Sequence, residues 1–342
     1  MSTKFVSKEP HVEDYWRGII LFGRNVASYK FALAKSLLEL RPTSGQIIKL
    51  GDIAPIYSRH LSEHIKNSDK QGTFNSSKFL DGCRKYNSGE LTQAELVELT
   101  IRYGFNNVID AFHVVGQGEI PQRFYTDERK ENNGIRITDE FSSLLQCDQL
   151  VNLPQEVEAR WRLVETAWEL GVSRSLLSID YDSNSEFLFS IDIGKRRKPV
   201  TGCRDALNGY QKGKCFYCFS DIQIAAPNSS YPDVDHFFPH ALKQHGISPI
   251  IDGVWNLVLS CQECNRGVGG KFDRIPTIRL LERLHRRNEF LISSHHPLRE
   301  TLIQQAGVSE AQRTAFLNTI HMKAWAALIH QWEPEEKDAT YF

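Results

Sequence analysis

Two pairs of cysteines share a spacing that suits a metal ion. The stretches "KCFYC" and "SCQEC" place two residues between the members of each pair, which are Cys215, Cys218, Cys261 and Cys264. A turn of that length can present two sulfurs to one ion, and two such turns complete a tetrahedral four-sulfur site of the structural zinc type. The alternative is two unrelated pairs of buried or redox-active cysteines. We predict a zinc ion that stabilises the fold and leaves no open position for a reaction.

The segment between the two pairs contains side chains suited to hydrolysis. The stretch "YPDVDHFFPH" supplies Asp235 and His236. A histidine titrates near neutral pH, which suits a general base that takes a proton from water. Asp235, together with Asn265 just after the last cysteine, offers the hard oxygen ligands that Mg²⁺ or Mn²⁺ prefers. Because adjacent side chains of a strand point to opposite faces, Asp235 and His236 need not serve the same atom.

Other polar residues near this segment admit two interpretations. His240 is either a third metal ligand or a polar side chain packed near the site, and Asp233 either tunes a metal or bonds to backbone. Arg266 and Lys271 follow the second cysteine pair, where they either contact phosphate groups of a nucleic acid or are ordinary surface charges.

These motifs resemble the HNH, or ββα-metal, nuclease family. The resemblance rests on "DVDHFFPH" and "WNLVLSCQECNRGVGGK", covers about residues 203–290, and fits the subset in which two cysteine pairs clamp the motif around zinc. The HNH domain of RNA-guided CRISPR nucleases has a similar Asp-Val-Asp-His start and a late Asn-Arg-Gly. The resemblance implies that Asn256, the middle residue of the motif, orients His236. Many members have histidine where Asn265 stands, and asparagine is a recognised variant.

The resemblance implies a metal-dependent endonuclease that hydrolyses phosphodiester bonds of DNA. His236 would activate water, and Asp235 and Asn265 would hold a magnesium or manganese ion. RNA is a second substrate to consider, and a role in restriction or anti-phage defence is an analogy to how such nucleases are deployed. Two rival functions are a zinc-stabilised nucleic-acid-binding module and an effector subunit that stays inactive until a partner engages it.

The charge of the chain is unevenly distributed. The net charge of the 342 residues is −1, yet residues 195–299 hold 16 Lys and Arg against 9 Asp and Glu, while residues 1–194 hold 22 against 27. That basic segment favours a module that binds a polyanion such as nucleic acid. We expect neither a secretory leader nor a membrane span, since there is no long apolar run, and the metal-type cysteine usage fits the cytoplasm.

The hydrophobic pattern predicts an α+β protein with two domains. Helical periodicity predicts helices over 13–40, 51–68, 75–87, Thr92 to Gly104, 138–145 and 153–171, a short one over 201–213, and closing helices over 276–291 and 309–332. Alternation predicts a β-hairpin at 177–193. We therefore expect a mostly helical domain over 1–194, which recognises, regulates or binds a protein partner or second copy, and a zinc-stabilised HNH domain over 195–342.

Overall fold

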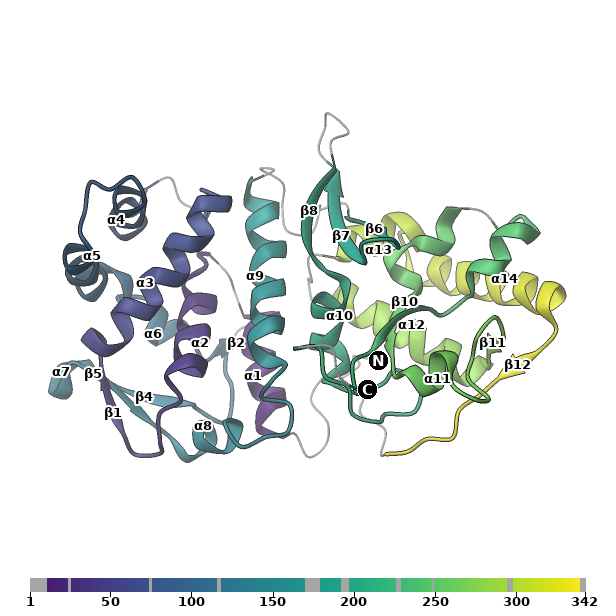
Figure 1. Ribbon diagram of the computed structural model, residues 1–342, viewed down its shortest axis with the longest axis horizontal. Helices are drawn as coiled ribbons and strands as arrows, with labels where there is room; N and C mark the ends of the chain where they lie inside the picture. Colours follow the sequence, from purple (N-terminus) through teal and green to yellow (C-terminus); the bar gives the residue numbers. More distant parts are fainter. Residues whose placement is uncertain are drawn as a thin grey trace. The chain divides into compact units, whose positions relative to one another are not determined.

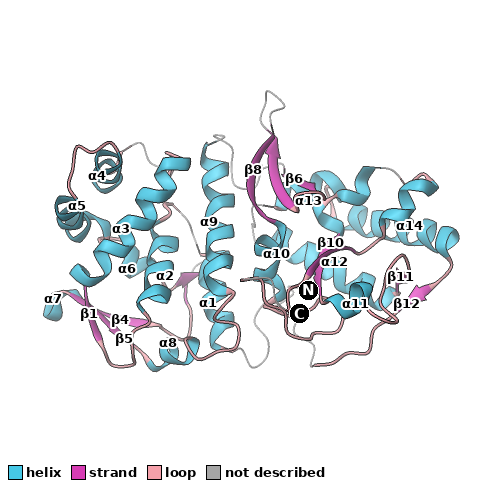
Figure 2. Ribbon diagram, viewed as in Figure 1, coloured by secondary structure: helices cyan, strands magenta, loops and turns pink. Residues whose placement is uncertain are grey.

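The computed structural model describes residues 11–23, 26–73, 76–115, 118–169, 179–191, 197–225, 229–247, 249–293 and 298–338. The chain forms two compact units, of which the N-terminal one is Lys8–Gly171 and the C-terminal one contains Val172–Phe342. Each unit mixes helices with short strands, which confirms the α+β class (Figure 2). The sequence placed the border at 194/195. The structure groups the predicted hairpin with the C-terminal unit, because its second strand pairs with a third strand that begins at Arg197.

Helices make up most of the N-terminal unit. They are α1 (Val12–Phe22), α2 (Tyr29–Leu40), α3 (Leu50–Asn67), α4 (Lys78–Asn87), α5 (Gln93–Leu99), the π-helical turn η1 (Thr100–Gly104), α6 (Val108–Ala111), α7 (Arg129–Asn132), α8 (Asp139–Leu144) and α9 (Leu153–Glu169). The predicted start at Thr92 is confirmed by a capping box. The Thr92 hydroxyl accepts the Glu95 amide at 3.3 Å, and the Glu95 carboxylate accepts the Thr92 amide at 2.8 Å.

Short strands of the N-terminal unit lie between the predicted helices. β1 (Ile47–Lys49), β5 (Gly134–Ile137) and β4 (Tyr125–Glu128) form an antiparallel sheet in that order, and β2 (Val114–Val115) pairs with β3 (Gly118–Glu119). A Cβ atom on Gly134 would lie 2.2 Å from the carbonyl oxygen of Ile48. Glycine at this position therefore permits β5 to approach β1.

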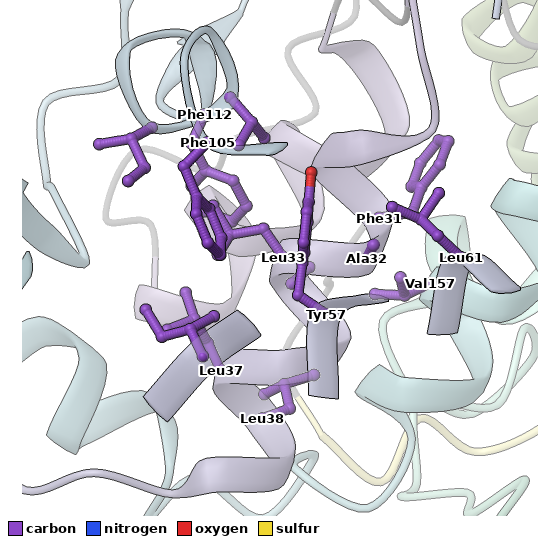
Figure 3. Packing of buried hydrophobic residues seen from close by; sticks show 14 of the residues in the cluster. Phe31, Ala32, Leu33, Leu37, Leu38, Tyr57, Leu61, Phe105, Phe112 and Val157 are labelled. Carbon is purple, nitrogen blue, oxygen red and sulfur yellow. The ribbon is translucent and has the colours of Figure 1, made fainter. Parts of the chain in front are cut away.

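An aromatic-rich core joins the helices of the N-terminal unit. Figure 3 shows Tyr57 of α3 beside Leu33 and Ala32 of α2. The rings of Tyr57 and Phe105 lie 4.8 Å apart, and the Tyr57 hydroxyl donates a hydrogen bond to the Gly104 carbonyl at 3.1 Å. Because the tyrosine hydroxyl has a partner, the ring is buried without leaving a polar group unsatisfied.

The C-terminal unit (teal to yellow in Figure 1) starts with an antiparallel sheet in the order β6 (Ile179–Asp182), β7 (Phe187–Ile191) and β8 (Arg197–Gly202). The first two strands confirm the predicted hairpin. The helices are α10 (Cys203–Gln211), α11 (Gln262–Arg266), α12 (Ile278–Ser293), α13 (Arg299–Ala306) and α14 (Glu310–Leu328), with 3₁₀ turns η3 (His240–His245), η4 (Pro249–Asp252) and η5 (Val254–Asn256). β9 (Asp233–His236) pairs with β10 (Leu257–Ser260), and β11 (Ile275–Pro276) with β12 (Gln331–Trp332). None of the described helices combines the length and apolarity needed to cross a membrane.

Candidate functional site

The strand β9, which pairs with β10, and the short helix α11 carry half of the ten predicted site residues, which are Asp235, His236, Cys264, Asn265 and Arg266. In the β9–β10 ladder His236 lies opposite Leu257, and Asp233 lies opposite Ser260. All four residues of β10 are buried. α11 begins two residues after β10 ends, so the second cysteine pair and Asn265 are held next to the strands.

The four predicted cysteines form one cluster. Each offers a sulfur that lies within 4.8 Å of the other three, and none of the four forms a disulfide. The sulfurs of Cys218 and Cys261 are 3.8 Å apart, which matches the spacing of about 3.8 Å expected for sulfurs around zinc at about 2.3 Å in a tetrahedron. Hydrogen bonding from Cys215 lowers the pKa of the Cys218 thiol, whereas burial raises the pKa of the Cys215 thiol. These four residues can therefore hold a zinc ion.

Two arginines of α12 bond to the backbone of the first cysteine turn and to the backbone where β10 begins. Arg283 donates hydrogen bonds to the carbonyl oxygens of Phe216 and Tyr217, in the first cysteine turn, at 2.7 and 2.9 Å. Arg287 donates to the carbonyl oxygens of Leu257 and Trp255, both at 2.9 Å, and burial lowers its pKa to about 10. Neither arginine was predicted to be a site residue, and in the sequence only their four-residue spacing, which puts them on one face of a helix, sets them apart. Part of the basic excess of this segment is thus internal and not available to a polyanion.

The side chain of Asn256 bonds to three backbone groups, which belong to Phe238 and Ile251. Its side-chain oxygen accepts the Phe238 amide at 2.8 Å, and its side-chain nitrogen donates to the carbonyl oxygens of Phe238 and Ile251 at 3.0 and 2.9 Å. The residue is fully buried, so it cannot touch a substrate. Its place in the structure is that of a residue that positions the loop between β9 and η4.

The bonds of Asn256 predict a loss of stability on substitution. We expect Asn256→Ala to lower the unfolding free energy by about 1–3 kcal/mol, because buried backbone groups of Phe238 and Ile251 lose their partner. Urea unfolding followed by tryptophan fluorescence measures this change. Asn265→Ala is the matched control, since the Asn265 side chain is half-buried and bonds to Asp233. An effect of Asn256→Ala no larger than that of the control would contradict the positioning role.

Asp235 and Lys271 form a buried ion pair. The Lys271 ammonium lies 3.1 Å from one Asp235 oxygen, and the Tyr217 hydroxyl donates to the other oxygen at 2.6 Å. Lys271 also donates to the carbonyl oxygen of His236 at 3.0 Å. The side chain of Lys271 is 1% exposed, so it has no surface to offer to a nucleic acid. Each oxygen of Asp235 already has one partner and the side chain is 7% exposed, which leaves a cation little room at this carboxylate.

The glycines of "NRGVGGK" bring Lys271 into the interior. A Cβ atom on Gly267 would lie 2.7 Å from the backbone of Glu263, and one on Gly270 would lie 2.8 Å from the Glu263 carbonyl oxygen. This close approach lets the chain fold back over α11, so that the Lys271 amide bonds to the Cys264 carbonyl at 2.6 Å. The second cysteine turn and the ion pair are therefore parts of one local structure.

Asn265 and Arg266 meet Asp233 and not Asp235. The amide nitrogen of the Asn265 side chain donates to Asp233 at 3.0 Å, and the Arg266 guanidinium donates to the same carboxylate oxygen at 2.9 Å. The expected partners of Asp233 were a metal ion or the backbone. In the structure its partners are these two side chains. The Arg266 side chain is 58% exposed and is available to a phosphate group.

His236 lies at the end of β9 in contact with His240 and Asp252. The Nε2 atoms of the two histidines are 3.0 Å apart, and one oxygen of Asp252 lies 3.4 Å from His236 Nε2 and 3.0 Å from His240 Nε2. Burial, followed by the neighbouring His240, lowers the pKa of His236 to about 3, and burial also lowers the pKa of His240. Both imidazoles are therefore neutral near pH 7. Asp252 was not among the predicted site residues, because no local motif distinguishes it.

Comparisons with known proteins returned no match, whether to protein-family models, to curated proteins or to solved structures.

Proposed function

We propose that the C-terminal unit is a metal-dependent HNH-type endonuclease that hydrolyses phosphodiester bonds of DNA. The observation that carries this proposal is the place of His236, a neutral histidine at the end of β9. β9 pairs with β10, which leads into α11, and Asn256 and the cysteine cluster hold these elements and the loop after β9 together. A neutral imidazole is the form that accepts a proton from water. The negative charge of an approaching phosphate would raise the pKa of His236 towards neutrality.

The predicted magnesium ligands are engaged elsewhere in the described structure. Both oxygens of Asp235 have partners, and the side chain of Asn265 bonds to Asp233. In this arrangement Asp235 and Asn265 do not form a magnesium site, and the proposed mechanism depends on His236. A divalent cation in such an enzyme neutralises charge on the phosphoryl oxygens, and magnesium keeps most of its coordination sphere as water and substrate oxygens.

The chain's own residues have separable roles in this proposal. His236 takes the proton of the attacking water, and Asn256 fixes the loop that follows it. Arg266 supplies an exposed positive charge beside the module for a flanking phosphate. Lys271 holds the backbone of His236 from the interior and is not part of the proposed interface. DNA is the proposed substrate on the basis of the resemblance alone.

Replacing His236 should abolish DNA cleavage. We expect nicked or linear product from supercoiled plasmid with the unaltered protein and Mg²⁺, and a rate at least about 10²–10⁴-fold lower for His236→Ala, because the general base is lost. His245→Ala is the matched control, since His245 is an exposed histidine of the same segment. Gel electrophoresis of the plasmid, with and without a chelator, measures the rates.

The same experiment separates this proposal from its rivals. Cleavage by His236→Ala at the rate of the His245→Ala control would overturn the assigned role of His236. Salt-sensitive DNA binding without cleavage in any lane would instead support the nucleic-acid-binding module. A single-stranded RNA run in parallel lanes tests the second substrate class.

A further inference from the structure

Three side chains converge on one point at the surface of the C-terminal unit. His236 is the last residue of β9, His240 is the first of η3, and Asp252 is the last of η4. Their facing atoms are His236 Nε2, His240 Nε2 and one oxygen of Asp252, and the three distances among them are 3.0, 3.0 and 3.4 Å. Donor atoms from three separate elements thus form a small triangle.

The triangle matches one face of a metal coordination tetrahedron. Nitrogen and oxygen ligands bind zinc at about 2.0–2.1 Å, which places neighbouring ligand atoms about 3.3–3.4 Å apart. The three measured distances need to open by only a few tenths of an ångström to reach that spacing. Two imidazoles and one carboxylate are ligands that zinc and similar transition metals accept, whereas magnesium prefers oxygen alone. Three protein ligands leave a fourth position open for water.

The carboxylate of Asp252 supplies independent support for a ligand. Its oxygen Oδ1 is buried and faces the Nε2 atoms of His236 and His240 at 3.4 and 3.0 Å, and no other described residue donates to it. The other oxygen, Oδ2, is bonded to the Lys243 ammonium at 2.5 Å, which fixes the orientation of the carboxylate. A buried carboxylate oxygen whose only neighbouring donors are two neutral imidazoles is poorly satisfied unless a ligand binds it. A metal ion between the three atoms would satisfy it.

We propose that His236, His240 and Asp252 bind a transition-metal dication of the zinc class, separate from the four-cysteine site. Bound metal takes the lone pair of His236 Nε2. That nitrogen then cannot accept a proton from water, so the same ion inhibits hydrolysis. The inhibition rests on the proposed nuclease function, whereas the metal binding does not.

Metal binding is tested first, without reference to activity. Protein that retains its structural zinc is titrated with Co²⁺, and the visible absorption of the ion and calorimetry report occupancy. We expect one further equivalent to bind the unaltered protein. We expect His240→Ala and Asp252→Asn to weaken this binding by about tenfold or more, and His245→Ala to leave it unchanged. His240 is 44% exposed and Asp252→Asn preserves the side-chain shape, so circular dichroism should show both variants folded.

The regulatory arm measures plasmid cleavage in Mg²⁺ with increasing Zn²⁺. Each variant is compared with its own rate without zinc. Zinc should inhibit the unaltered protein at the concentration that fills the new site, and His240→Ala should need about tenfold more zinc. If no second Co²⁺ binds while DNA is cut, the metal site is wrong and the nuclease stands. If Co²⁺ binds and no DNA is cut, the metal site stands and the nuclease proposal fails. Stimulation by zinc would overturn the inhibitory role.

Discussion

Removal of one sulfur from the four-cysteine cluster should unfold the C-terminal unit and leave the N-terminal unit folded. Zinc bound to four cysteines contributes about 10–16 kcal/mol to the folding of small modules, while the net stability of a domain is about 5–15 kcal/mol. The free energy lost with the ion is therefore of the same size as the whole net stability of a domain. The described part of the N-terminal unit contains no comparable group of metal ligands, so its core does not depend on the ion.

Cys264→Ala tests this expectation. We expect elemental analysis to show about one zinc ion fewer per chain, and limited proteolysis to digest the C-terminal unit while a fragment near residues 8–171 persists. Cys203→Ala is the matched control, because Cys203 is a buried cysteine of the same unit outside the cluster. It should retain the zinc and lose about 1 kcal/mol of unfolding free energy. A Cys264→Ala protein with full zinc content and a protease-resistant C-terminal unit would rule out the zinc staple.

Asp235→Ala should destabilise the C-terminal unit by about 3–5 kcal/mol, because it leaves the Lys271 ammonium buried without its countercharge. Burial raises the pKa of Asp235 itself, and the ion pair with Lys271 opposes that rise. The double variant Asp235→Ala, Lys271→Met should be less unstable than the sum of the two single variants, because neither charge is then left alone. Urea unfolding of the four proteins in this double-mutant cycle measures the coupling energy.

The same cycle distinguishes an ion pair from a magnesium ligand. If Asp235 holds the catalytic cation, Asp235→Ala should lose cleavage with a stability change below about 1 kcal/mol, and the two substitutions should be additive in stability. If Asp235 acts mainly as the partner of Lys271, Asp235→Ala should lower the unfolding free energy and also disturb the bond from Lys271 to the His236 carbonyl oxygen. If Asp235 both pairs with Lys271 and holds the cation, the double variant should regain stability but should still fail to cleave DNA.

The exposed charge near the proposed site is smaller than the sequence count suggests. The side chains of Lys212, Lys214, Lys271, Arg283 and Arg287 are buried, although all five belong to the basic segment. Arg283 and Arg287 bond to backbone carbonyls, and Lys214 bonds to Asp338 and Asp221. In the proposed nuclease, contacts to phosphate would therefore fall to exposed side chains such as that of Arg266. Substituting it should weaken DNA binding only modestly.

Several features followed from the sequence because they depend on neighbours within a few residues. The spacing of each cysteine pair sets the geometry of one turn, and tertiary packing then brings the two turns together in the cluster of four. The capping box at Thr92 and the hairpin at 179–191 likewise arise from local hydrogen bonds and alternation. The class of mixed helix and strand follows from the same patterns. The nuclease activity stays a prediction, and its residues now have defined surroundings.

Tertiary packing decided the partners of the charged residues, because those partners lie far apart along the chain. Lys271 reads as a surface lysine after a glycine-rich stretch, yet Gly267 and Gly270 let the chain fold inward and pair it with Asp235. Asp252 carries no motif, and only the packing of two 3₁₀ turns against β9 places it beside His236. Local sequence fixes which side chains a turn can present. Burial determines which of them meet, since an unpaired charge or polar atom is costly only where water is excluded.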